Sequence, residues 1–195
     1  MKEWNWQSVI EWIVAMLLLC VSLFFSSFFE HIHFSAEEAM KQSEKTFDYG
    51  PSEISEVRDF ENMRFYLGKY KDWFSLTSVK RNYGFLWSFD SDVGGVPIDE
   101  SEAISYGQSG SQAGDAVVYS CYGIKNNPQV TDIEVDVHTE EQQTNKKAED
   151  DIQTYRDQVN DEGMFLINWE AKNSFIVAIR GLDKNGKILY QEKLN

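Results

Sequence analysis

Residues 115–138, DAVVYSCYGIKNNPQVTDIEVDVH, decide the fold class of this chain of 195 residues. Their second half, residues 130–138, alternates isoleucine and valine with aspartate and glutamate, as a strand with one buried and one wet face requires. Their first half is a run of β-branched, aromatic and small residues, and the step Asn126-Asn127-Pro128 between the halves is turn chemistry. We therefore expect a pair of strands joined by a turn.

Similar runs on both sides of this stretch extend the prediction to the whole chain. They occupy residues 62–67, 73–79, 83–89, 164–170, 174–183 and 187–194. The last two runs are joined through Lys184-Asn185-Gly186, and an Asn-Gly step favours a type I′ hairpin turn. About seven strands with tight connections, and no alternation of strands with helices, predict a mainly β fold. We expect a small antiparallel sandwich-like or curled-sheet domain with one or two short helices.

Three segments do not follow the two-residue period. Residues 53–59 are interpreted as a short helix or irregular chain, because their apolar residues have a loosely helical spacing. Residues 106–114, YGQSGSQAG, are interpreted as a flexible glycine-rich loop. Residues 139–162 are polar, and Ile152 and Tyr155 begin a modest helical stripe, so we expect a loop that leads into a short helix.

The apolar run at residues 12–29, WIVAMLLLCVSLFFSSFF, admits three interpretations. A cleaved signal peptide is disfavoured because Lys2 is the only basic side chain before the run, and no small-residue cleavage site follows it. A lipid-modified Cys20 is disfavoured because three leucines precede it and the apolar run continues past it. The third interpretation is a retained helix, since 18 residues at ~1.5 Å each span about 27 Å, close to the ~30 Å of a bilayer core. We expect a transmembrane helix.

The flanks of this run support the same interpretation. Tryptophans cluster at its start, histidines follow its end, and Glu11 lies near the interface; the residues concerned are Trp4, Trp6, Trp12, His31 and His33. Indole rings favour the headgroup layer of a membrane. Basic residues are almost balanced between the two sides, with Lys2 before the run and Lys41 and Lys45 well after it. An uncleaved signal-anchor places the short N-terminus inside and the bulk of the chain outside the cytoplasm.

The domain organisation follows from this topology. Ser35 and Glu38 have the spacing of a helix capping box, and Gly50-Pro51 ends that segment. We expect a cytoplasmic tip and transmembrane helix at residues 1–33, a stalk or linker at 34–52, and an extracytoplasmic β-rich domain at 53–195.

Composition excludes some classes of partner. The chain has 32 acidic and 18 basic residues, a net charge of −14, and such a surface repels phosphate backbones. We therefore expect no nucleic-acid partner. Aromatic residues make up 14% of the chain, which argues against disorder. The only cysteines, Cys20 and Cys121, cannot meet if the first lies in lipid, so no disulfide framework is expected.

The search for chemical sites gives no residue that we assign as catalytic, cofactor-binding or metal-ligating. His138 is the only histidine beyond the membrane exit, and it is interpreted as a solvated strand end. Two acidic turns have part of a calcium ligand set, Asp90, Asp92 and Gly94 in one and Asp183, Asn185 and Gly186 in the other. Both are interpreted as turns. One aromatic group could form a binding surface, although aromatic residues of strands more often belong to the core: Trp73, Phe74, Tyr83, Phe85, Trp87 and Phe89.

The C-terminal part of the chain resembles a group of bacterial proteins, and this resemblance implies a source for the chain but no activity. The run at residues 117–137, followed by residues 164–170 and 175–191, resembles small uncharacterised membrane-anchored or secreted proteins of low-GC Gram-positive, bacillus-like bacteria. The shared features are a Tyr-Gly step before an Asn-Pro turn, an alternating strand, and a final Asp-x-Asn-Gly-Lys hairpin. The resemblance implies a surface location, and it carries no functional residue over to this chain.

The sequence as a whole predicts a single-pass protein of the cell membrane whose extracytoplasmic domain binds a ligand or supports envelope assembly without catalysis. Its expected partners are the membrane and another envelope protein or a cell-wall component, with no cofactor. One alternative is a hydrolase that acts on envelope polymer or peptide through paired carboxylates. Another is an accessory subunit held by contacts in the bilayer through Ser22, Ser26 and Ser27.

Overall fold

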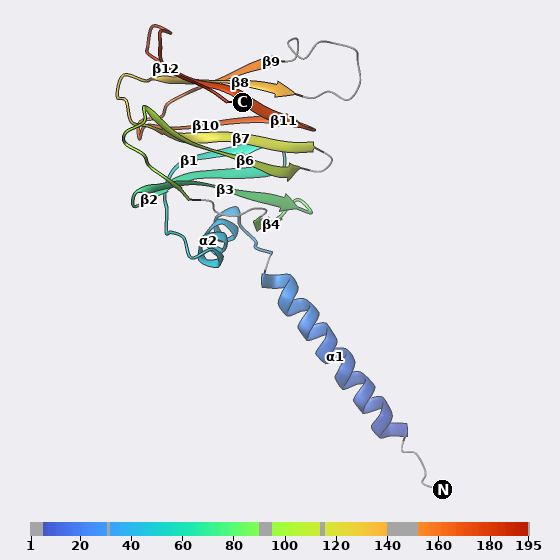
Figure 1. Ribbon diagram of the computed structural model, residues 1–195. Helices are drawn as coiled ribbons and strands as arrows, with labels where there is room; N and C mark the ends of the chain where they lie inside the picture. Colours follow the sequence, from blue (N-terminus) through green and yellow to red (C-terminus); the bar gives the residue numbers. More distant parts are fainter. Residues whose placement is uncertain (1–5, 31, 90–94, 114–115, 140–151, 195) are drawn as a thin grey trace, which may run out of the picture.

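The computed structural model describes residues 6–30, 32–89, 95–113, 116–139 and 152–194. Within these ranges the chain forms two helices and three antiparallel sheets (Figure 1). The elements are α1 (Trp6–Glu30), α2 (Ala36–Thr46), β1 (Glu53–Phe60), β2 (Met63–Tyr70), β3 (Trp73–Asn82), β4 (Leu86–Phe89), β5 (Val96–Pro97), β6 (Ile104–Ala113), β7 (Ala116–Lys125), β8 (Asp132–Thr139), β9 (Ile152–Gln158), β10 (Met164–Ala171), β11 (Ser174–Leu182) and β12 (Ile188–Lys193). The predicted mainly β, antiparallel class is confirmed.

The three sheets are stacked as layers (Figure 1). The helix-side sheet has the order β1-β2-β3, and both β4 and β5 pair with the other edge of β3. The middle sheet has the order β10-β7-β6, and the far sheet has the order β12-β11-β8-β9. As a result, β1, β10 and β9 lie at one side of the stack, and β5, β6 and β12 lie at the other.

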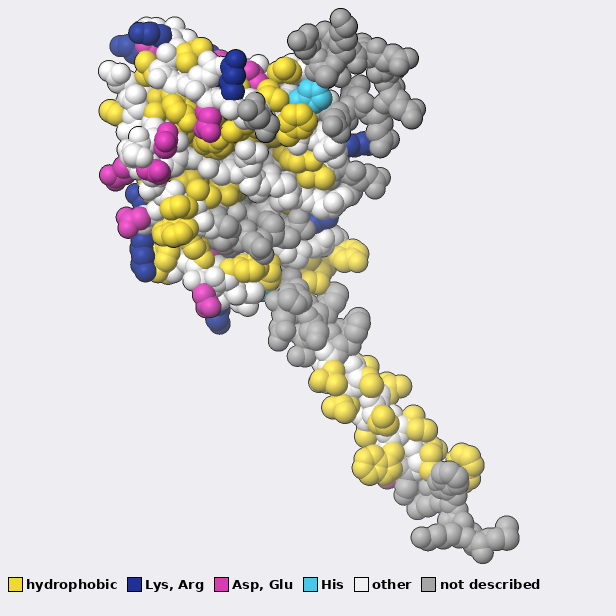
Figure 2. Space-filling model, viewed as in Figure 1, with side chains coloured by type: hydrophobic (Ala, Val, Ile, Leu, Met, Phe, Trp, Pro, Cys, Tyr) yellow, Lys and Arg dark blue, Asp and Glu magenta, His cyan; other side chains and the backbone are white. Residues whose placement is uncertain are grey.

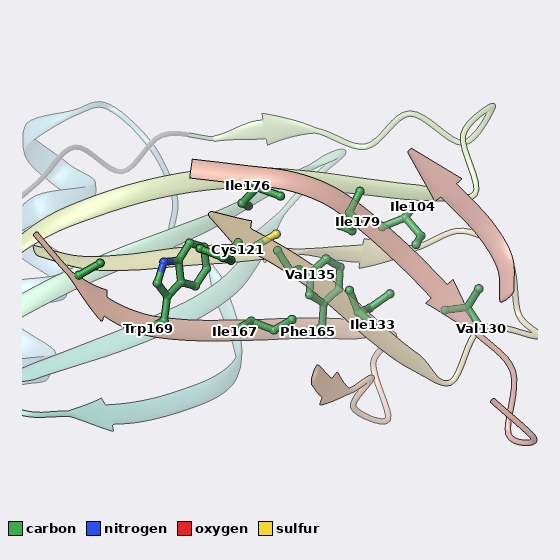
Figure 3. Close-up of a cluster of buried hydrophobic side chains, with 12 residues drawn as sticks. Ile104, Cys121, Val130, Ile133, Val135, Phe165, Ile167, Trp169, Ile176 and Ile179 are labelled. Atoms are coloured by element: carbon green, nitrogen blue, oxygen red, sulfur yellow. The ribbon is translucent and has the colours of Figure 1, made fainter. Parts of the chain in front are cut away.

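The middle sheet is buried on both faces, and strand β10 shows why its sequence is so apolar. Its odd residues Phe165, Ile167 and Trp169 pack against the far sheet, where Figure 3 shows them facing Val135 and Ile179. Its even residues Met164 and Leu166 pack against Phe65, Leu67 and Phe74 of the helix-side sheet. A strand with two buried faces needs a continuous apolar run rather than an alternating one. The run at residues 164–170 was correctly predicted as a strand.

The outer face of the helix-side sheet is covered by α2. The Ser35 hydroxyl accepts a hydrogen bond from the Glu38 backbone N–H at 3.1 Å, so the predicted N-cap is confirmed. Ala36, Ala39 and Met40 are buried in a cluster with Tyr66 and Val79. Part of the segment that we treat as a stalk, residues 34–52, is therefore packed on the sheet.

Helix α1 projects away from the stacked sheets (Figure 1). Every described side chain from Ile10 to Leu23 is exposed, and Trp12 is 73% exposed. Figure 2 shows hydrophobic side chains along the described part of the helix. Within the part of the chain that the structure describes, no helix combines the length and the hydropathy needed to cross a membrane. After the helix, His33 and Trp87 exchange two backbone hydrogen bonds of 2.7 Å, which tie the chain to β4.

Three secondary-structure predictions are wrong, each for a local reason. Residues 53–59 belong to strand β1, where a bulge between Ile54 and Glu56 interrupts the two-residue period and leaves a spacing that resembles a helix. Residues 106–113 belong to strand β6, where Gly107 allows β5 of the helix-side sheet to approach closely. Residues 152–158 form the edge strand β9 rather than a helix, because pairing with β8 outweighs a weak helical stripe.

Two predictions about connections also need correction. Strands β7 and β8 do not pair with each other, because the chain crosses from the middle sheet to the far sheet at Asn126-Asn127-Pro128. The β11–β12 hairpin is confirmed, but its turn is not type I′. Within residues 183–187 only Gly186 has a positive φ, of 79°, and the Gly186 N–H bonds the Asp183 carbonyl at 2.9 Å.

Candidate functional site

The strongest candidate site is a cleft where the three sheets meet at the side formed by β5, β6 and β12. Its volume is about 530 Å³, and each sheet contributes one strand to its lining. The lining residues are Val96, Pro97, Asp99, Glu102, Ile104, Ser105, Tyr106, Tyr190, Gln191 and Glu192. A concave surface with a few convergent polar groups is the usual form of a ligand site.

Two tyrosines converge on one carboxylate in this cleft. The Tyr190 hydroxyl donates to Oε2 of Glu192 at 2.7 Å, and the Tyr106 hydroxyl donates to the same oxygen at 3.2 Å. Tyr190 and Glu192 are two residues apart on β12, so they share one face of the strand, and Tyr106 reaches them from β6. Both hydrogen bonds require the carboxylate to act as the acceptor.

Burial and negative charge make both phenols poor acids. Burial, with the charge of Glu192 as the next cause, raises the pKa of Tyr106 to about 12. Burial and the hydrogen bond to Glu192 also raise the pKa of Tyr190 well above its ordinary value, and the charge of Glu102 adds to this shift. The two tyrosines therefore remain neutral hydrogen-bond donors across the physiological pH range.

The acidic wall of the cleft is a short loop that Asn126 holds in place. The Asn126 side-chain amide donates to the backbone carbonyls of Asp99 and Glu102 at 2.8 and 2.9 Å, and contacts the Ser105 hydroxyl at 3.0 Å. The Asp99 carboxylate accepts hydrogen bonds from the Ser101 hydroxyl and backbone N–H, which lower the pKa of Asp99. The loop is therefore fixed by the residue that begins the crossing to the far sheet.

A close approach of strands supports the wall formed by β5 and β6. A Cβ atom added at Gly107 would lie 2.9 Å from both Cζ of Tyr122 and Cγ2 of Val96. Only glycine fits between β5 and the buried Tyr122 ring without displacement. The glycine that suggested a loop in the sequence thus serves the packing beside the cleft.

The chemistry of the cleft suits a ligand that carries a positive charge. Glu192, Glu102 and Asp99 contribute acceptor oxygens, and none of the described residues that line the cleft is a lysine or arginine. The rings of Tyr106 and Tyr190 provide apolar faces that pack well against an alkyl chain or a cation. An ammonium or guanidinium group is therefore the chemical class that this cleft accommodates best.

The opposite side of the stack is closed. Arg58 of β1 bonds the Leu166 carbonyl of β10 and the Glu56 carboxylate, and its Nη2 lies 3.0 Å from Oδ2 of Asp157 on β9. The same Asp157 oxygen accepts the Leu166 N–H at 3.2 Å, and Asn160 exchanges hydrogen bonds with the backbone of Met164. One arginine thus links all three sheets. The outward backbone groups of β10 at Leu166 are bonded by side chains, and those at Met164 by the side chain and the backbone N–H of Asn160.

The acidic turns considered for calcium have different outcomes. The Asp183 carboxylate accepts the backbone N–H groups of Asn185 and Lys187 at 2.8 and 2.9 Å, and both bonds lower its pKa. It therefore acts within its turn, as predicted. Asp90, Asp92 and Gly94 lie outside the described residues. Within the described ranges, no group of three or more histidine, cysteine, aspartate or glutamate side chains is placed to hold a metal ion.

The histidines and cysteines lie apart from the cleft. His138 stacks on Phe175 of the neighbouring strand with ring centroids 4.9 Å apart. His33 belongs to the tie between α1 and β4, and His31 lies outside the described residues. Cys20 is exposed on α1, whereas Cys121 is fully buried in the core, and this burial raises its pKa.

The predicted aromatic group does not form one surface. Phe74 is buried between the helix-side and middle sheets, while Trp87 and Phe89 are half-buried beside α2. Tyr83 and Phe85 protrude from the β3–β4 turn. Sequence reasoning missed the actual cleft because Tyr106 lies in the segment interpreted as a loop. The same-face spacing of Tyr190 and Glu192 was the available signal.

The fold is a three-layer antiparallel β stack with an exposed apolar N-terminal helix. No family model, no curated protein and no solved structure matches the chain.

Proposed function

We propose that this chain is a membrane-anchored binding module that α1 holds in a bilayer, with the β stack outside the cytoplasm. The observation that carries the proposal is the exposure of the apolar side chains of α1. Leucine, isoleucine, valine and methionine side chains are exposed on all sides of the helix between Ile10 and Leu23. In water this surface costs about 25 cal/mol for each Å², whereas lipid tails accept it.

The sequence extends this surface beyond the described side chains. Apolar or small residues continue through residue 29, so the full run from residue 12 is long enough for the hydrocarbon core of a bilayer. Trp6 and Trp12 stand near its start, where indoles favour the headgroup layer. The bacillus-like source implied by the sequence resemblance fits a domain presented on the cell surface.

The cleft supports binding as the role of the β stack. Glu192 already accepts two phenol hydrogen bonds, and Asp99 accepts two from Ser101. A cleft lined by carboxylates attracts a cation, whereas a glycosidase-type hydrolase needs one carboxyl group that delivers a proton. We propose a positively charged group of an envelope component or protein as the ligand, and we rank the hydrolase second because three carboxylates line the same cleft.

Alkaline carbonate extraction of membranes from cells that make the full chain tests the anchor. We expect the protein to remain in the membrane pellet, and recovery of the intact chain in the soluble fraction would overturn the proposal. Protease treatment of intact cells, followed by detection of the C-terminus, tests the orientation. Digestion of the β stack is expected, and complete protection would reverse the assigned topology.

Binding of spermine by the detergent-solubilised full chain tests the cleft, with the Glu192→Gln variant beside the native protein. We expect calorimetry to show spermine binding that the variant weakens. The matched control is Glu170→Gln, which removes an exposed carboxylate of β10 away from the cleft. Equal affinity of the native protein and both variants would show that the cleft is not a cation site.

A further inference from the structure

Three exposed aromatic side chains belong to the two segments that are joined next to the end of α1. Phe34 is 71% exposed, Tyr83 is 84% exposed and Phe85 is 61% exposed. Phe34 directly follows His33, and Phe85 lies two residues before Trp87 on β4. Because His33 and Trp87 are joined by two backbone hydrogen bonds of 2.7 Å, these segments are held together beside the end of α1.

The local backbone does not explain why one of these residues is a tyrosine. Tyr83 and Gly84 have φ values of 51° and 82°, and the Phe85 N–H bonds the Asn82 carbonyl at 3.3 Å. These positive values are those of a type I′ turn, whose first central position favours asparagine, aspartate or glycine. A bulky aromatic residue there is unfavourable for the turn and makes little use of the core. The exposed ring is available to contact a surface outside the protein.

The charge of this region is opposite to that of the whole chain. Residues 79–89 include Lys80 and Arg81 and no acidic residue, although the chain has a net charge of −14. Arg81 is exposed, and its guanidinium lies 5.9 Å from the Trp87 ring centre. Arg64 lies 5.3 Å from the same ring and is paired with Asp59 at 2.6 Å. Lys80 donates to the Gln112 carbonyl, so Arg81 is the cation best placed to meet an external anion.

We infer that Phe34, Arg81, Tyr83 and Phe85 form an exit patch that rests in the headgroup layer of the bilayer that α1 enters. This inference rests on the proposed membrane anchor. Aromatic rings at the water–lipid interface and basic side chains near anionic headgroups are both favourable. The patch gives the β stack a second attachment beside the helix. It therefore holds the stack at one tilt, with the helix-side sheet next to the membrane and the far sheet away from it.

The test uses the full chain with Cys20 replaced by serine, reconstituted in vesicles of phosphatidylcholine with phosphatidylglycerol. A nitroxide is attached at Tyr83→Cys and, in a second protein, at Lys184→Cys in the β11–β12 turn. Collisions with oxygen report lipid contact, and collisions with a water-soluble nickel complex report exposure to water. We expect position 83 to lose most of its nickel collisions while position 184 keeps them.

The outcomes separate this inference from the proposed anchor. Carbonate resistance together with nickel accessibility at position 83 equal to that at position 184 overturns the exit patch and leaves the anchor standing. Release of the chain by carbonate overturns both. A patch that is exposed in pure lipid vesicles but shielded in native membranes would show that it contacts a protein instead, which also overturns the inference.

A charge variant tests the contribution of the headgroups. Arg81→Gln, measured through the label at position 83, should lower the ratio of docked to undocked stack about fivefold on anionic vesicles. It should have little effect on vesicles of phosphatidylcholine alone. Arg156→Gln, which removes an exposed arginine of the far sheet, is the matched control and should change neither value. An equal effect of both substitutions would contradict a specific role for Arg81.

Discussion

The strand edges on the two sides of the stack differ in what contacts them. At the side of β1, β10 and β9, Arg58, Asp157 and Asn160 occupy backbone groups at the edge of the middle sheet and join all three layers. At the side of β5, β6 and β12, the layers leave a cleft of about 530 Å³ lined by tyrosines and carboxylates. We call these the closed edge and the open edge.

One edge contributes mainly to the stability of the fold, and the other contributes to binding. Unpaired strand edges invite association with other chains, and a bridging arginine covers one such edge with internal hydrogen bonds. The open edge instead keeps polar groups directed into a cleft, where they remain available to a ligand. Substitutions at the closed edge should therefore affect mainly the free energy of unfolding, whereas those at the open edge should also change binding.

The largest effect is expected from Arg58→Leu at the closed edge. The substitution removes the partner of the Leu166 carbonyl and leaves Glu56 and Asp157 without their shared cation. Breaking a buried charge pair costs 3–5 kcal/mol, and the partly exposed guanidinium places this loss at about 3 kcal/mol. Urea unfolding of the full chain in detergent, followed by tryptophan fluorescence, measures it.

The matched control is Arg156→Leu on the neighbouring strand β9. Arg156 also pairs with two acids, Asp132 and Glu134, but its side chain is 48% exposed. Exposed pairs contribute about 0–1 kcal/mol, so the control should unfold nearly as the native protein does. If both leucine variants lost the same free energy, Arg58 would not be the link between the layers.

The next largest effect is expected from Gly107→Ala at the open edge. The added methyl group would lie 2.9 Å from both Tyr122 and Val96, so β5 or the tyrosine must move, at a cost of about 2 kcal/mol. Gly110→Ala on the same strand is the control, because its nearest neighbour is Cγ1 of Val117 at 3.3 Å. Urea unfolding of the two variants should differ clearly. Equal stability would mean that the wall between β5 and β6 adapts freely.

A smaller effect is expected from Asn126→Ala, which releases the loop at the acidic wall of the cleft. The amide contacts two carbonyls and the Ser105 hydroxyl, and its loss should cost about 1 kcal/mol because water can replace part of these bonds. Hydrogen exchange at residues 99–103 should accelerate more than exchange elsewhere. Asn127→Ala loses only the bond from the Gln129 N–H and serves as the control. Unchanged exchange in Asn126→Ala would separate Asn126 from the loop.

The sequence predicts the strands that show a clear pattern of burial, and misses those whose pattern is weak or interrupted. The alternation at residues 132–138 and the apolar run at 164–170 directly reflect burial in the layers, so β8 and β10 were found. Strand β9 buries little of its surface, and β1 contains a bulge, so neither shows a clean period. The pairing of β11 with β12 was predicted from its turn, but that of β7 was not, because β7 and β8 are adjacent in sequence and belong to different sheets.

The cleft was beyond the reach of sequence reasoning for a related reason. Its lining comes from three strands of three sheets, and no local pattern records that β6 and β12 meet. Only the pair Tyr190 and Glu192, two residues apart on one face of a strand, was visible as a possible polar contact. The third polar residue, Tyr106, is followed by Gly107, and the glycines of this segment led to its interpretation as a loop.

The smallest effect, and the most specific to the open edge, is expected from the titration of its tyrosines. An unfolded tyrosine loses its proton near pH 10, whereas the pKa of Tyr106 in the folded chain is raised to about 12. The unfolded chain therefore releases this proton first, and the free energy of unfolding should fall as the pH rises from about 10 to about 12.

In Glu192→Gln the negative charge is removed while burial, the larger cause of the raised pKa, remains. The pKa of Tyr106 should then fall part of the way toward its ordinary value, and the decline in stability should become shallower. Phenolate absorbance between pH 9 and 12, compared with Tyr106→Phe to identify the step, measures the shift; an unchanged titration in Glu192→Gln would show that the carboxylate does not act on the phenols.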